Sequence, residues 1–334
     1  MTLRGHFVCA IFLFATLLVA TSVQTQQRED EIVASLAGAR IIIHVARDHI
    51  IVAAIDQPSE AHSVPPRLLQ LDATHVGIIL GASEWQIPSE PKPVRLDHDF
   101  QSTAPTTRQH YQDYPDAAAP DLEAIGVQFL EKLRPLVAQL HHRIEFRPDE
   151  PLLEVIVLGF ARDYGAEIWQ VDYRVEQQQI AARGEYWQTK ILRPRFTQLY
   201  PPEGKHSPRT LVEIRFPETA AAAGSAKEND APLIALIQSG DPRIARLRSS
   251  ETRFAKVLDA IDRGQAQKAA PTDAADFLRA ALPVIAPKSN FFIGTLEEQR
   301  GFEWIVPPDE PMEKTDDNSR PAGAPSLRQK PATP

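Results

Sequence analysis

The side chains best equipped for chemistry in this sequence are its histidines and its single cysteine. Cys9 lies in an apolar run near the N-terminus that predicts a cleaved export signal. The exported chain would then hold no cysteine, which excludes disulfides, thiol catalysis and cysteine-ligated metals. The adjacent His141 and His142 point to different sides, and His44 and His49 straddle a predicted hairpin turn, so neither pair suits a metal. We expect no metal and no cofactor. No Gly-x-Ser-x-Gly elbow is present, although a dispersed Ser-His-Asp triad stays open.

The overall composition narrows the class of protein. Hydrophobic residues make up 43 % of the 334 residues and charged residues 24 %, with a formal net charge of -8. These values exclude a wholly disordered, a collagen-like or a multi-span membrane chain. The negative net charge offers no basic field for phosphates, so we expect no nucleic-acid partner. Proline is in excess, with 29 residues.

Both ends of the chain predict segments outside the folded domain. After Arg4, residues 7–20 form an uncharged apolar run. Its length fits a signal peptide and is short of the roughly 20 residues that span a bilayer. Cleavage after Ala20 or after Ser22 satisfies the small-residue rule, and an uncleaved anchor is the alternative. The proline-rich segment 307–334 cannot bury enough apolar surface to offset chain entropy, which predicts a disordered tail. We expect an exported protein, periplasmic or extracellular, with no membrane attachment after cleavage.

Hydrophobic patterning divides the rest into strands and helices. The predicted strands are 40–46, 50–55, 75–80, 152–160, 167–173, 211–216, 291–293 and 302–306. Helical spacing runs from residue 121, where Pro135 should kink or end the helix, over 254–261, and over 277–285, with Thr272 as a candidate cap. This order favours antiparallel sheets with helices packed outside and argues against a doubly wound parallel sheet.

The predicted organisation is a single domain with attachments. We expect a signal peptide at 1–22, a linker at 23–38, one domain at 39–306 and the tail at 307–334. Within the domain, the proline-rich 83–114 and the polar 201–270 are predicted insertions.

Several segments resemble a proteasome-type subunit. The first part is the strand 50–56, which ends in an aspartate, followed by 66–71 and by the strand 75–82, which ends in Gly-Ala. Further on, 155–160 and 167–172 are similar to a later pair of strands in that family. The resemblance implies an α+β fold, the four-layer αββα sandwich of the N-terminal-nucleophile hydrolases.

The resemblance also implies where catalytic residues would lie. Active members of the family cleave an amide bond with an N-terminal threonine whose free α-amine acts as base, aided by a lysine and an aspartate. Asp56 occupies the aspartate position. Arg67 occupies the lysine position, where an arginine supplies charge but cannot exchange a proton. The nucleophile position falls at Ala39 or Arg40, and neither can attack a carbonyl.

Two hydroxyl residues keep a hydrolase alternative open. Cleavage after Ala20 would make Thr21 N-terminal, but it precedes the expected position by so many residues that the chain would have to fold back. Ser35 would become N-terminal only by self-cleavage after Ala34. The segment 183–186, where the family has Gly-Ser-Gly-Ser, contains no serine.

Two functional hypotheses follow. The first is an exported proteasome-subunit-like protein without threonine-peptidase activity, which serves as a scaffold or binding module for an unknown protein partner or for a second copy of itself. The alternative is an exported N-terminal-nucleophile peptidase or amidase that uses Thr21 or Ser35 after processing.

Overall fold

The fold is taken from a computed structural model. The described residues are 33–46, 48–56, 66–72, 74–97, 99–103, 122–141, 151–161, 165–180, 186–201, 211–216, 231–287 and 289–308. The predicted signal peptide, Thr21 included, lies outside them, as does the predicted tail beyond Pro308.

The hairpin predicted from two β-branched runs is confirmed and forms the centre of a five-stranded sheet. β2 (Ala39–Val45) and β3 (His49–Asp56) pair antiparallel, with Ala39 opposite Asp56. The predicted strand at 211–216 is β12 (Leu211–Phe216), which pairs with β2. The last two predicted strands are β13 (Phe291–Glu297) and β14 (Gly301–Val306), which continue the sheet beyond β3. The strand order is β12-β2-β3-β13-β14.

A second, seven-stranded sheet is built around one long strand. Its path runs β1-β5-β7-β8-β11, and β4 and β6 also pair with β5. The predicted hairpin 152–160 with 167–173 is confirmed as β7 and β8. A separate two-stranded ribbon consists of β9 and β10. The bounds are β1 (Val33–Ala37), β4 (Arg67–Gln70), β5 (His75–Gln86), β6 (Val94–Arg95), β7 (Leu153–Ala161), β8 (Gly165–Tyr173), β9 (Val175–Gln179), β10 (Trp187–Ile191) and β11 (Arg195–Tyr200).

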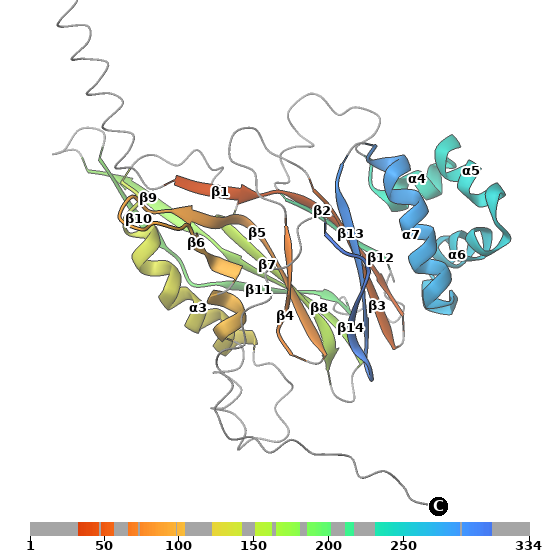
Figure 1. The fold of residues 1–334 in the computed structure, drawn as a ribbon, viewed down its shortest axis with the longest axis horizontal. Helices are drawn as coiled ribbons and strands as arrows, with labels where there is room; N and C mark the ends of the chain where they lie inside the picture. The colour runs from red at the N-terminus through yellow and green to blue at the C-terminus, as the bar shows by residue number, and fades with distance from the viewer. Residues whose placement is uncertain are drawn as a thin grey trace, which may run out of the picture.

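The helices form two groups beside the sheets (Figure 1). α3 packs on the seven-stranded sheet, and α4 to α7 pack together beside the five-stranded sheet. The bounds are α3 (Leu122–Val137), α4 (Leu233–Ser239), α5 (Pro242–Ser250), α6 (Thr252–Asp262), the short 3-10 helix η4 (Ala266–Lys268) and α7 (Pro271–Ile285). Pro135 lies inside α3, which ends two residues later, as expected. The predicted cap at Thr272 is wrong: α7 begins at Pro271, after Ala270, with no side-chain cap.

The core consists of three apolar clusters separated by the sheets. Alternate residues of a strand face opposite sides, so Ile41 and Ile43 of β2 face the other sheet while Ile42 faces the helices. The middle cluster joins the two sheets, and each of the other two joins a sheet to its helices. Both faces of β2 and β3 are therefore covered, which explains their continuous apolar runs.

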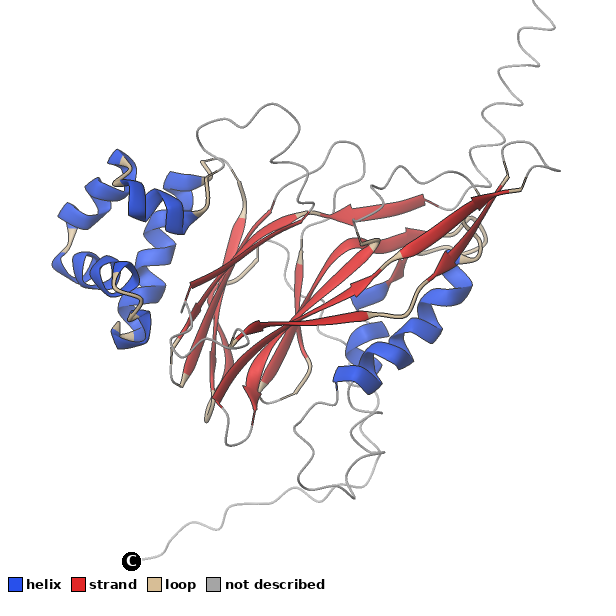
Figure 2. Cartoon of the chain, turned by 180° about the vertical axis from the view of Figure 1, so that it is seen from behind, coloured by secondary structure: helices blue, strands red, loops and turns tan. Residues whose placement is uncertain are grey.

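The predicted fold class needs correction. The chain is not the expected α+β four-layer αββα sandwich of the N-terminal-nucleophile type, because antiparallel strands dominate: the described part is 43 % strand and 34 % helix. All its strand pairs are antiparallel. Figure 2 shows this central body of strands with the helices in two unequal groups. In the described part, α3 is the one long helix on the seven-stranded sheet. The class is mainly β.

Candidate functional site

Asp56, the predicted catalytic aspartate, ends β3 beside Ala39. Ala54 belongs to the cluster between the sheets, so Asp56, two residues later, faces the same side. Its backbone N–H donates to the Asn290 carbonyl at 2.9 Å, but its buried Oδ1 has no hydrogen-bond partner. Burial raises the pKa of the Asp56 carboxyl above its ordinary value. Its neighbour Ala39 is fully buried and presents a methyl group.

Arg67, the second predicted site residue, is turned to the other face of its sheet. It pairs with Ile79, which belongs to the cluster under α3. Its guanidinium Nη1 lies 3.5 Å from Asp97 Oδ2 and 3.8 Å from Glu84 Oε2. The structure therefore does not bring Arg67 together with Asp56, and a catalytic role for either stays a prediction.

The nucleophile position lies inside a continuous chain. β1 ends at Ala37, Gly38 follows, and β2 begins at Ala39 in the other sheet. Ser35, one of the two predicted hydroxyl nucleophiles, stands in the middle of β1 opposite Glu84. The other, Thr21, is outside the described residues. No free α-amine exists at Ala39 or Arg40 while this crossing is intact.

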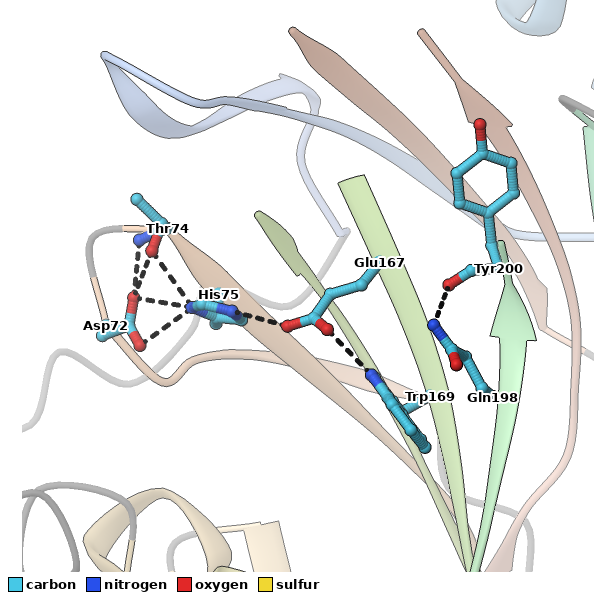
Figure 3. Close-up of polar contacts among 7 residues, drawn as sticks. All are labelled: Asp72, Thr74, His75, Glu167, Trp169, Gln198 and Tyr200. Carbon is cyan, nitrogen blue, oxygen red and sulfur yellow. Dashed lines mark hydrogen bonds and ion pairs between the residues drawn. The ribbon is translucent and has the colours of Figure 1, made fainter. Parts of the chain in front are cut away.

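A polar constellation that sequence reasoning missed lies at the start of β5 (Figure 3). The imidazole of His75 is 1 % exposed and lies between two carboxylates. Its Nδ1 is 3.1 Å from Asp72 Oδ2, and its Nε2 is 3.4 Å from Glu167 Oε1. The other oxygen of Glu167 accepts a hydrogen bond from Trp169 Nε1 at 2.9 Å. The turn before β5 is thereby tied to β8.

Strand register explains how His75 reaches across the sheet. His75 of β5 pairs with Gly159 of β7, which in turn pairs with Glu167 of β8. A Cβ at Gly159 would overlap the His75 ring, so only glycine leaves room for the imidazole to cross β7. Asp72 is fixed from its own side, because it accepts hydrogen bonds from the N–H of Thr74 at 2.6 Å and from its hydroxyl at 3.1 Å.

The two carboxylates beside His75 favour the protonated form of its ring. Burial alone would lower its pKa, but hydrogen bonds and charge attraction from Asp72 and Glu167 outweigh that effect, and the pKa is raised. Carboxylates only accept, so both ring nitrogens must carry protons to bond both of them. The Thr74 hydroxyl lies 3.1 Å from Nδ1 but also donates to Asp72. This arrangement ties the turn before β5 to β8.

Metal binding and membrane spanning find no support in this part of the chain. Within the described ranges, no group of three His, Cys, Asp or Glu side chains converges as metal ligands would. Helices long and apolar enough to cross a bilayer are also absent from those ranges.

Comparison with protein-family models and with curated proteins adds no relative. No family model matches the chain, and a comparison with curated proteins finds no match.

Proposed function

We propose that this protein is an exported scaffold or binding module that does not hydrolyse amide bonds with an N-terminal nucleophile. The proposal rests on the continuous chain that crosses from β1 through Gly38 to β2. N-terminal-nucleophile chemistry needs a hydroxyl or thiol next to a free α-amine. Here the position carries the methyl group of Ala39, and its nitrogen is in a peptide bond between two paired strands.

The neighbouring Arg40 is also committed to a structural role. Its guanidinium is 2 % exposed, donates to Glu213 Oε1 at 2.7 Å and donates to the Ala231 carbonyl at 2.9 Å. Glu213 also accepts the N–H of Leu233 at 2.7 Å, at the start of α4. Arg40 thus attaches the helices to the sheet and points away from Asp56.

The Ser35 form of the peptidase alternative requires a described strand to be cut. For Ser35 to become N-terminal, the chain must break inside β1, and Val33 and Ala34 would lose their pairing with Gln86 and Trp85. No described feature favours that break. The alternative is therefore an outcome of the test below.

The surface indicates how a partner would bind. Among the described residues Val127, 43 % exposed, is the one exposed large hydrophobic side chain. A partner that binds through charged side chains of this surface should bind more weakly as salt rises.

The test uses the mature protein purified from the exporting cell. We expect an N-terminal sequence that begins at neither Thr21 nor Ser35. We also expect an unchanged intact mass after incubation with a covalent inhibitor of N-terminal threonines, while an active proteasome run in parallel is labelled. A labelled chain, or amide hydrolysis that disappears in Ser35→Ala or Thr21→Ala, would overturn the proposal.

The scaffold role is tested separately by association. Light scattering and cross-linking of the exported fraction, at low and high salt, should show an assembly that dissociates as salt rises. A chain that stays monomeric and cross-links to nothing at low salt would contradict this part of the proposal.

A further inference from the structure

His44 is a buried histidine beneath the helices α4 to α7. On β2 it stands two residues after Ile42 and so faces the helices as Ile42 does. In the sheet it pairs with Ile51 of β3 and Leu211 of β12, both members of the helix-side cluster. The short helix η4 packs against β2. His44 is 1 % exposed and is closed off by these apolar neighbours.

The ring nitrogens of His44 have no hydrogen-bond partner. Neither Nδ1 nor Nε2 makes a hydrogen bond of ordinary geometry, although the backbone of Ala266 in η4 and the backbone of His44 itself are near enough to favour a proton on the ring. A neutral ring with an unpaired N–H is already costly to bury, and a charged ring costs far more. The packing of η4 on β2 therefore depends on His44 staying neutral.

No charged group of the surrounding described elements offsets a charge on His44. On β2 and β12, Arg40, Glu213 and Arg215 face the same side, and both arginines bond to Glu213. On β3, His49 shares that face and pairs with Asp48 and Glu297. Lys268 of η4 is exposed. The buried residues of α7 are all apolar: Ala274, Ala275, Phe277, Leu278, Ala281, Leu282 and Ile285.

The helices have a second attachment that contains no histidine. Arg40 and Glu213 hold the start of α4 through Ala231 and Leu233. The helices are therefore attached to the sheet at two places. The attachment at α4 is polar, and the contact at η4 is uncharged and sensitive to acid.

We propose that acidification releases η4, α6 and α7 from the five-stranded sheet, with the protonation of His44 as the trigger and the Arg40–Glu213 attachment as the hinge. Burial lowers the pKa of His44 to about 4, so the closed form holds the ring neutral at pH 7. In the open form the ring regains its ordinary pKa of about 6.5. Each fall in pH between these values favours the open form.

The seven-stranded sheet should not open with the helices. Asp72 and Glu167 raise the pKa of His75, so its surroundings favour the form that acid produces. The opening is therefore confined to the side of the molecule that carries His44.

Hydrogen exchange of the full chain, corrected for the intrinsic effect of pH, tests this directly. Between pH 7 and pH 5 we expect roughly a 20-fold loss of protection in α6 and α7, from the linkage of the two pKa values. Peptides from β7 and β8 should show no such loss. His44→Leu should keep the helices protected at pH 5. The control His141→Gln, which alters an exposed ring stacked on Tyr186, should open like the wild type.

A second measurement covers the case in which His44→Leu fails to fold. In the wild-type chain labelled at histidine, the NMR signal of His44 should titrate near pH 4. Unchanged protection of α6 and α7 at pH 5, opening in a folded His44→Leu, or titration of His44 near pH 6.5 would each overturn the proposal.

Discussion

Gly159 lies directly under the imidazole of His75, where the paired strands β5 and β7 leave space for no larger residue. The glycine therefore makes the bridge from Asp72 to Glu167 possible, although it takes no part in the hydrogen bonds.

Gly159→Ala should break the bridge. The added methyl would push the His75 ring off β7, and a buried charge would lose part of its hydrogen bonding. We expect a loss of about 2–4 kcal/mol in the free energy of unfolding, measured by urea denaturation. Gly77→Ala is the matched control in β5, because its Cβ would make ordinary contacts of 3.6 Å with Leu71 and Phe100. Equal losses in the two variants would show that the bridge does not depend on Gly159.

The His75 bridge should stabilise the protein most at low pH. The pKa of His75 is raised in the folded state, so its contribution is fully present below the unfolded value of about 6.5 and is lost as pH rises through the folded value. The difference in unfolding free energy between wild type and His75→Gln should therefore shrink from pH 6 to pH 9. Glu167→Gln should bring the NMR titration of His75 to lower pH. A difference that is constant with pH would contradict the charged bridge.

Glu213→Ala should strongly destabilise the attachment of the helices. It leaves the Arg40 guanidinium buried without its carboxylate and removes the acceptor for the Leu233 N–H. Removing one partner of a buried ion pair costs about 3–5 kcal/mol. Arg248→Ala, in an exposed pair network with Asp259 and Asp262, is the control and should cost less than about 1 kcal/mol. Thermal unfolding followed by circular dichroism compares the two.

Tyr173 should ionise only when the protein unfolds. Its side chain is fully buried and its hydroxyl donates to the Gly126 carbonyl at 3.0 Å, so burial raises its pKa well above the ordinary value. Its contribution is present below the unfolded pKa of about 10 and is lost as pH rises further. As pH rises, phenolate absorbance should show one tyrosine that ionises at the same pH at which the protein unfolds. Tyr173→Phe should remove that ionisation step. The variant should lose about 1 kcal/mol at pH 7 with its hydrogen bond.

Long apolar strands were predictable because a strand that is buried on both faces has a continuous run of apolar residues. β2, β3 and β7 match their predicted runs closely. The half-buried edge strand β12 also matches its predicted range. Polar strands gave no such signal: β9 reads Val-Glu-Gln-Gln-Gln and lies in an exposed ribbon. No helix was predicted over α4 and α5, although α6 in the same predicted insertion 201–270 was expected from its helical spacing. Missing the polar strands and expecting a family fold made the predicted class too helical.

The end of a strand at a glycine was also misjudged. The predicted strand stopped at Leu80, but β5 continues to Gln86 because Gly81 adopts a positive φ of 86°. Across this glycine, Leu80 faces the other sheet and Ala82 faces the α3 side. Only glycine adopts this conformation without strain.

The candidate site could not be predicted in full, because it depends on how the strands pair, and a single sequence does not show the register of the strands. Asp56 could be placed at a strand end, but the face taken by Arg67 depends on its pairing with Ile79. The His75 bridge needs three strands in register, and Glu167 is 92 residues away in the chain. The one available signal was Gly159 within an otherwise apolar run, which marks a close approach by another group.

The crossing at Gly38 also has a mechanical consequence. β1 and β2 belong to different sheets and a single residue joins them. Tension applied to the chain ahead of Val33 therefore acts first on the pairs between β1 and β5 and reaches β2 only after they separate. A pull on the N-terminus must therefore separate β1 from the seven-stranded sheet before it loads the centre of the five-stranded sheet.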